Sequence, residues 1–363
     1  MKRLLLSLAA LAGLYVCQAA EQGPGVALVY PIVPSTGKIV IDGDLGDEAW
    51  KNAVTVSGFT DSGSPNIAKD QTSMTMCYDN DYFYIAITCF ESSMNKLHTG
   101  CFGQDAPFWE DDSIEFFIDE NHDHATFYQF AVTAGGATFD LRNGTSVWNG
   151  KWQSAVKQYK DRWTVEVALP FTLFEHFEDK SHFEPTAGAV WGFNLCRERQ
   201  AGGKHELFNW ADVERNFHQA HLFGHLLYMP KDWMDRSDII AKAALGAGRI
   251  ENQLQLEDGF WLVPTNGGEP RKMTYSEAIV ERFAKLPDRV AELKELFKVV
   301  KIKEAEEFDA QLKEFDAWKT RSSTIGKVTS EQYAQATIFY SSFMKKLNDY
   351  YWLAKLAKLN QEI

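Results

Sequence analysis

Positive charge is in short supply in this sequence. The 363 residues hold 37 Lys and Arg against 50 Asp and Glu, which gives a net charge of −13. This deficit argues against nucleic acid or an anionic membrane as the main partner, because both require a basic surface. Beyond residue 20 no apolar run is long enough to cross a bilayer, and no segment repeats. We therefore expect a protein that is not an integral membrane protein and binds no nucleic acid.

Cysteine is also sparse, with five in the chain, and the spacings fit no zinc pattern. Met1-Lys2-Arg3 followed by apolar residues 4–16 predicts a signal peptide over residues 1–20, and hence a secreted or periplasmic protein. Cys17 leaves a lipoprotein as an alternative. An exported chain could carry disulfides. However, Cys77 and Cys89 lie at unequal distances from the turn between them, so buried free thiols are the better prediction for at least two of the remaining four, Cys77, Cys89, Cys101 and Cys196.

Aromatic residues are abundant, at 13% with 11 Trp. Many of them stand in short alternating segments that end at Gly, Asn or Asp turns, which is typical of antiparallel strands. Such segments predict a β-sandwich, jelly-roll-like, over residues 38–230, after a linker over residues 21–37. The strand segments are 72–78, 82–90, 114–118, 126–133, 163–169, 190–196 and 223–228.

The pattern changes after Pro230. Residues 231–270 show no regular period and predict an irregular connector. Apolar residues then recur three and four apart, which indicates helices over 276–286, 288–320 and 329–359. We expect residues 271–363 to end in a helical hairpin, since Gly326 separates the last two helices. Its aromatic stripe predicts a helix–helix seam, and the hairpin could also serve self-association or a protein partner.

The segment 107–120 combines an aromatic, a run of acids and an alternating strand. Ile114, Phe116 and Ile118 share one face, and Glu115 lies on the other. A carboxylate between large apolar neighbours suits a wet binding face better than a core. A turn centred on His122 would place Glu115 directly opposite Gln129 on that face.

Several of these segments together resemble family 9 carbohydrate-binding modules. The segments are 41–50 (IDGDLGDEAW), 78–85 (YDNDYFYI), 109–119 (WEDDSIEFFID), 191–194 (WGFN), Trp210 and 223–226 (FGHL). They occur in the family's order and cover residues 38–230, leaving out the helical region. The resemblance implies a β-sandwich that binds polysaccharide or oligosaccharide without catalysis, beside a glycoside hydrolase.

The resemblance also implies a site. Trp109 would form one wall of an aromatic sandwich around a sugar ring, and Phe217 stands where the family has the second wall, a Trp. Glu115 would accept hydrogen bonds from hydroxyl groups, and Gln129 supplies an amide. Ala131 stands where the family has a sugar-contacting Arg. A structural calcium ion is implied as well, with Asp42, Asp44 and Asp119 as oxygen ligands.

Two other functions remain open on the sequence. Glu110, Asp112 and Glu115 fit the spacing Glu-x-Asp-x-x-Glu, which resembles the catalytic strand of family 16 glycoside hydrolases. In a regular strand Glu110 and Glu115 would point to opposite faces, so an enzyme would need a β-bulge. A haem or redox sandwich would need axial ligands. The candidates are His122, His124, His205, His218, His221 and His225.

Overall fold

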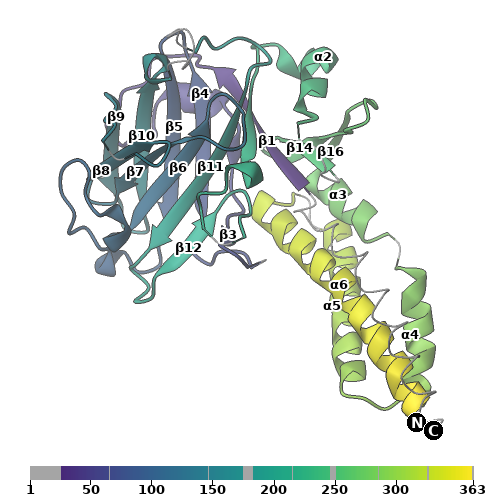
Figure 1. Ribbon diagram of the computed structural model, residues 1–363. Helices are drawn as coiled ribbons and strands as arrows, with labels where there is room; N and C mark the ends of the chain where they lie inside the picture. Colours follow the sequence, from purple (N-terminus) through teal and green to yellow (C-terminus); the bar gives the residue numbers. More distant parts are fainter. Residues whose placement is uncertain are drawn as a thin grey trace, which may run out of the picture.

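The computed structural model describes residues 26–64, 66–145, 147–174, 183–214, 216–245, 251–284, 286–324 and 327–361. The signal-peptide prediction and Cys17 lie outside these residues. Most of the described chain forms one curled sheet with a helical region at its C-terminal side (Figure 1). The strands are β1 (Val26–Pro34), β2 (Thr55–Val56), β3 (Thr60–Asp61), β4 (Thr72–Tyr78), β5 (Tyr82–Phe90), β6 (Ser113–Asp119), β7 (Tyr128–Thr133), β8 (Thr138–Arg142), β9 (Gln153–Gln158), β10 (Arg162–Pro170), β11 (Val190–Arg199), β12 (Glu206–Asn209), β13 (Gly224–Tyr228), β14 (Glu251–Gln255), β15 (Gly259–Val263) and β16 (Arg271–Thr274).

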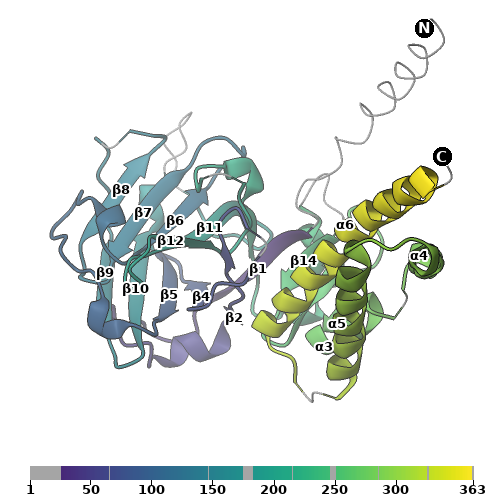
Figure 2. The same cartoon turned by 90° about the horizontal axis from the view of Figure 1, so that it is seen from below.

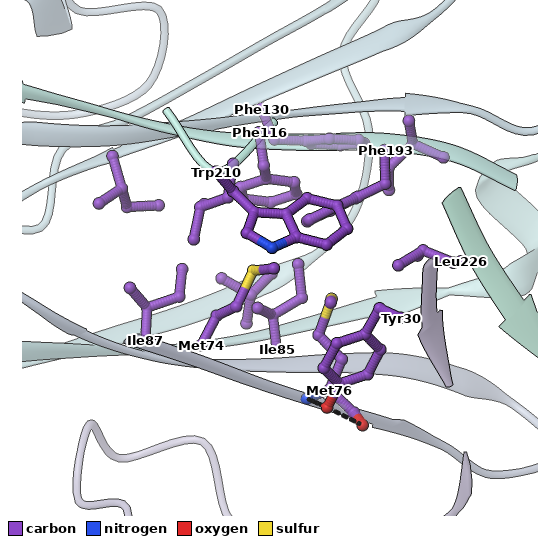
Figure 3. Packing of buried hydrophobic residues seen from close by; sticks show 14 of the residues in the cluster. Tyr30, Met74, Met76, Ile85, Ile87, Phe116, Phe130, Phe193, Trp210 and Leu226 are labelled. Carbon is purple, nitrogen blue, oxygen red and sulfur yellow. Dashed lines mark hydrogen bonds between the residues drawn. The ribbon is translucent and has the colours of Figure 1, made fainter. Parts of the chain in front are cut away.

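The main strand order is β8-β7-β6-β11-β13-β1-β4-β5-β10-β9. The sheet curls so that its two halves face each other across one core, giving a β-sandwich-like body. Figure 3 shows Phe116, Phe130 and Phe193 from one half above Met74, Ile85 and Ile87 from the other. The alternation seen in the sequence therefore predicted correctly that Ile114, Phe116 and Ile118 of β6 share one face, which is turned to the core.

Strand β1 corrects the prediction that residues 21–37 are a linker. It pairs in parallel with β13 through Val29–Ile32 and with β4 through Val33 and Pro34, so it joins the two halves of the sheet. The Tyr30 hydroxyl donates to the Val54 carbonyl and accepts from the Met76 amide at 2.7 Å, and this contact ties the strand to the core. The sandwich-like body thus needs residues that precede position 38.

The region after Pro230 also differs from the expectation of an irregular connector. It contains the short helix α2 (Ser237–Ile240), and then β14, which pairs in parallel with the first half of β1 from Val26 to Val29. β15 and β16 extend this pairing as an antiparallel ladder. One strand, β1, therefore connects the sandwich-like body with the C-terminal region.

Four helices follow, where three were predicted with the last two as a hairpin. They are α3 (Tyr275–Arg282), α4 (Asp288–Val299), α5 (Glu304–Thr324) and α6 (Ser330–Gln361). The expected single helix over 288–320 is broken between Val299 and Glu304. Both α4 and α5 pack against α6 (Figure 2). The aromatic stripe of α6 is the predicted seam: Tyr333, Phe343 and Tyr350 are buried against the other helices. None of the helices in the described ranges is long and apolar enough to span a membrane.

The hairpin between β6 and β7 has a different register from the one predicted. Glu115 lies opposite Ala131, and Gln129 lies opposite Phe117. The loop is centred on Asp123, one residue later than expected. His122 and His124 hold positive φ angles there, and Asp119 accepts hydrogen bonds from the Asp123 and His124 amides at 3.1 and 2.9 Å. This loop geometry, which alternation cannot reveal, sets the register.

Candidate functional site

Trp109 stands at the mouth of strand β6. It lies in a single turn of 3-10 helix (Phe108–Glu110) that follows Pro107, and 49% of its surface is exposed. The neighbouring Phe108 is buried and packs against Phe139. The rings of Trp109 and Phe108 meet edge to face, with their centroids 5.3 Å apart. The Gln200 side chain donates to the Trp109 carbonyl at 2.8 Å. The turn is thus anchored from inside, and it presents an indole ring to solvent.

The acids beside Trp109 hold the turn in place. Asp111 accepts hydrogen bonds from the amides of Gly100 and Cys101, each at 2.8 Å. Asp112 is fully buried and accepts from the amides of His98, Gln200 and Ala201 at 2.8 to 3.2 Å. Buried carboxylates bound by backbone amides are structural anchors. The acidic run therefore explains how Trp109 is positioned.

Glu115 and Gln129 come together despite the corrected register, because diagonal neighbours share a face. The Gln129 side-chain amide donates to Glu115 at 2.6 Å. The Gln129 carbonyl oxygen lies 3.1 Å from Nε2 of His218, which closes this end of the cluster. Glu115 and Gln129 are 2% and 3% exposed. These two polar side chains are therefore buried, and they do not form an exposed edge of a binding site.

A second carboxyl group adjoins Glu115. Glu198 stands on the same outer face of β11, diagonal to Glu115 across the β6–β11 pairing, and its carboxyl hydrogen-bonds that of Glu115. Burial, together with the charge of Glu198, raises the pKa of Glu115 well above its ordinary value. His205 covers Glu198 from the solvent side, with Nε2 at 2.8 Å from the carboxylate. Glu115 therefore keeps a proton beyond the pH at which an exposed Glu would lose it.

The cations of β11 lie on the opposite face of the strand. Arg197 and Arg199 both bind Glu91, at distances of 2.7 to 2.9 Å, in a buried network that also includes Asp70. Strand alternation separates this network from Glu115 and Glu198. The arginines close one end of the core and do not neutralise the carboxyl pair.

Phe217 does not form an open wall. It is 5% exposed and packs in a cluster on the outer face of the sheet. Phe217 packs there with Val213, Ala220 and Leu222, next to Phe117 and Cys196. The predicted pairing of Phe217 with Trp109 as two stacking walls is therefore not present in this structure.

The predicted calcium ligands serve other partners. Asp42 accepts from the Asp44 amide, Asp44 pairs with Lys157 at 2.6 Å, and both oxygens of Asp119 accept from backbone amides. Across the described ranges no group of three or more His, Cys, Asp or Glu side chains has the geometry of a metal site. These three residues thus do not fit one calcium ion, and calcium binding stays a prediction.

Five of the six histidines considered as metal or haem ligands contact each other or other side chains: His122, His124, His205, His218 and His225. Nε2 of His122 lies 2.9 Å from Nδ1 of His225, and the ring centroids of His122 and His124 are 4.4 Å apart. Burial and the neighbouring His124 lower the pKa of His122 to about 4.

The hydrolase alternative gains no support, since Asp112 is bound by amides, Glu110 is exposed and Glu115 is buried.

Glu198, His205 and His218 are the residues of this cluster that the sequence analysis did not identify as part of the site. Glu198 could have been found, because strand β11 continues to Arg199 and places it on the face of Asn194 and Cys196. The two histidines come from loops. No spacing rule links His205 or His218 to β6, so only the folded chain brings them to Glu115.

The comparisons with known proteins agree with the residues that carry the resemblance. The model of the family described as "Carbohydrate family 9 binding domain-like" matches residues 41–229. Endo-1,4-beta-xylanase A of Thermoanaerobacterium saccharolyticum is 28% identical over 200 residues, which are 54% of this chain and 16% of that protein. Exoglucanase XynX of Acetivibrio thermocellus is 26% identical over 204 residues, 54% of this chain and 17% of that protein. The chain thus spans about a sixth of the length of these relatives.

Solved structures give a weaker likeness. A family 9 carbohydrate-binding module from Caldicellulosiruptor kristjanssonii in complex with cellotriose has a TM-score of 0.41 and 17% identity, covering 56% of this chain and 94% of that one. A carbohydrate-binding protein from Bacteroides uniformis has a TM-score of 0.44 and 14% identity, covering 55% and 98%. The family match itself spans more than half of the 363 residues, and the chain belongs to the carbohydrate family 9 binding domain-like family.

Proposed function

We propose that this protein binds oligosaccharide or polysaccharide chains at Trp109, without catalysis, on a scaffold of jelly-roll type. The observation that carries the proposal is the exposed indole of Trp109 on an anchored turn at the mouth of β6. Sugar rings have C–H-rich faces that an aromatic plane removes from water. A half-exposed Trp held by a buried Phe and a backbone contact is preorganised for that role, since little entropy is lost on binding.

The carboxyl pair of Glu115 and Glu198 supplies polar chemistry. A neutral carboxyl group both donates and accepts, so Glu115 with its proton suits sugar hydroxyls that do the same. Its burial means that a hydroxyl reaches it only if His205 or His218 moves aside, since these rings lie over Glu198 and Gln129. Trp109 therefore provides the main contact, and the Glu115 cluster a second one.

The relatives suggest the setting. The two named above are a xylanase and an exoglucanase, which are much longer than this chain. We infer that this chain works beside glycoside hydrolases in carbohydrate breakdown, after export directed by residues 1–20. Self-association through the C-terminal helices is a further proposal. Its motivation is a row of exposed apolar side chains near the end of α6: Trp352, Leu353, Leu356 and Leu359.

An affinity-gel screen tests the proposal directly. The mature protein should be retarded in native gels that contain soluble xylan or a β-glucan, and Trp109→Ala should strongly reduce the retardation. Trp352→Ala is the matched control, because Trp352 is also exposed but lies on α6. Equal retardation of the Trp109→Ala variant would refute Trp109 as the site.

A further inference from the structure

A cavity lies where the sandwich-like body meets the C-terminal region. Its volume is about 540 Å³, which falls within the range of roughly 300–1,000 Å³ typical of small-molecule sites. One wall comes from the start of β1 and from loops at Gly58, Trp210 and Phe223. The other wall comes from β14, β15, α3 and the first turns of α6. Figures 1 and 2 both show this end of α6 beside the sheet.

The two walls are held together by specific contacts. The hydroxyls of Ser57 and Ser330 lie 2.6 Å apart across the junction. Gly58 has a φ of +93 degrees, and a β-carbon there would lie 3.4 Å from that of Ala334. The chain thus approaches α6 closely at a residue that only glycine suits. With the β1–β14 pairing, these contacts make the cavity a built feature of one folded chain.

The lining combines aromatic rings with hydrogen-bonding groups. Arg282 of α3 donates to Thr337 at 3.0 Å, and Asp212 of the opposite wall accepts from Thr60 at 2.7 Å. Gln253 donates to the Tyr333 hydroxyl at 2.8 Å, and the buried amide oxygen of Gln255 has no hydrogen-bond partner among the described residues. The aromatic residues of the lining are Trp210, Phe223, Phe260, Tyr275, Tyr333 and Tyr340.

These groups favour one ligand class. The described lining has one cation, Arg282, and one anion, Asp212, on opposite walls, so their charges cancel. A phosphate or polyanion would lack a cluster of cations. A purely apolar ligand would leave the charged and amide groups without compensation for lost water. A neutral polyol satisfies both demands, because its C–H faces cover rings and its hydroxyls pair with Arg, Asp and Gln.

We propose that this cavity is a second carbohydrate site, which takes a short neutral oligosaccharide between the sandwich-like body and the helices. The proposal is separate from the Trp109 site, and either can hold without the other. It gives the C-terminal region, which the family match does not cover, a role in binding: α3 and α6, together with β14 and β15, supply half of the lining.

The test is a two-by-two set of variants of the full chain, titrated calorimetrically with cellotriose and with xylotriose. Trp109→Ala removes the exposed site, and Ile338→Trp fills the cavity from α6, where Ile338 is part of the lining. We expect two binding events in the wild type, one in each single variant and none in the double variant. Trp352→Ala, outside the cavity on the same helix, should bind as the wild type does. Thermal melts check folding, and Ser341→Trp replaces Ile338→Trp if that variant fails to fold.

The outcomes separate the two proposals. If Trp109→Ala alone abolishes binding of both trisaccharides, the cavity proposal is refuted and the Trp109 site stands. If Trp109→Ala retains full binding and the cavity-filling variant loses it, the cavity proposal holds and the Trp109 site is refuted. Binding that persists in the double variant, or a wild type that binds neither trisaccharide, overturns both.

Discussion

Replacing Trp109 with Ala should weaken sugar binding strongly and leave the fold nearly unchanged. The exposed 49% of Trp109 amounts to about 120 Å² if the whole side chain covers ~250 Å². At ~25 cal/mol per Å², full coverage by a sugar is worth about 3 kcal/mol, and coverage of one face about half of that. A loss of ~1.5–3 kcal/mol corresponds to roughly a 10- to 100-fold weaker affinity.

The stability cost should be small for the same geometric reason. Half of the Trp109 surface is already in water, and its main intramolecular contact is the edge of Phe108. The bond from Gln200 reaches the Trp109 carbonyl and survives the substitution. We expect the free energy of unfolding to fall by about 1 kcal/mol, against ~3–5 kcal/mol for truncation of a buried Trp.

Calorimetric titration with cellotriose and a thermal melt measure the two quantities on the same samples, and a variant that also carries Ile338→Trp isolates the Trp109 site. Trp352→Ala controls for the loss of an exposed indole elsewhere. Unchanged affinity at the Trp109 site, together with a fall of several kcal/mol in stability, would falsify the assignment of Trp109 as a stacking residue.

Four other changes test the remaining points. Folded Glu115 holds a proton that the unfolded chain releases near its ordinary pKa, so the free energy of unfolding should fall as pH rises above ~4.5 through the raised pKa. Glu115→Gln should flatten this pH dependence in melts from pH 5 to 8. The same variant should weaken sugar binding less than tenfold, since a neutral acceptor replaces a neutral carboxyl. A steeper dependence in the variant would contradict this reasoning. Phe217→Ala should lower stability by ~3 kcal/mol in denaturant titrations, because Phe217 is buried; a loss of sugar affinity alone would restore it as a binding wall. A fragment that begins at Lys38 should show no cooperative melt, since it lacks β1, whereas cooperative unfolding of that fragment would show that β4 and β13 do not need the strand. Removal of calcium by exhaustive chelation should lower the melting temperature, with recovery on adding Ca²⁺, if the ion implied by the family is bound; an unchanged temperature removes the prediction.

Local patterns were enough for much of the fold. Strands β4 and β5 match the predicted ranges because an Asp-Asn-Asp turn separates two alternating segments, and alternation depends on strand geometry alone. The exposed position of Trp109 agrees with the stacking wall that the family resemblance implied. The seam of α6 followed from spacings of three and four, since a helix buries one stripe wherever its partner lies.

Where prediction failed, the deciding contact was distant or depended on a loop. Residues 26–34 read as a linker because Pro31 and Pro34 disfavour a central strand, yet β1 joins the two halves of the sheet and is paired with β13, β4 and β14. Gln129 was predicted to lie directly opposite Glu115, but it lies opposite Phe117, because two residues with positive φ shift the β6–β7 turn by one position. Phe217 was taken for an exposed wall, but the segment around it folds onto Phe117.

The β-sandwich-like body could thus be predicted from short-range alternation and turns, and the family from the resemblance of several short segments. The rest of the binding chemistry depends on contacts that form only in the folded chain. Glu198 meets Glu115 because β11 pairs with β6 across about 80 residues of chain, and His205 and His218 reach them from separate loops. The cavity at the junction likewise exists only because β14 pairs with β1 and α6 returns to Gly58, contacts between segments that no local pattern connects.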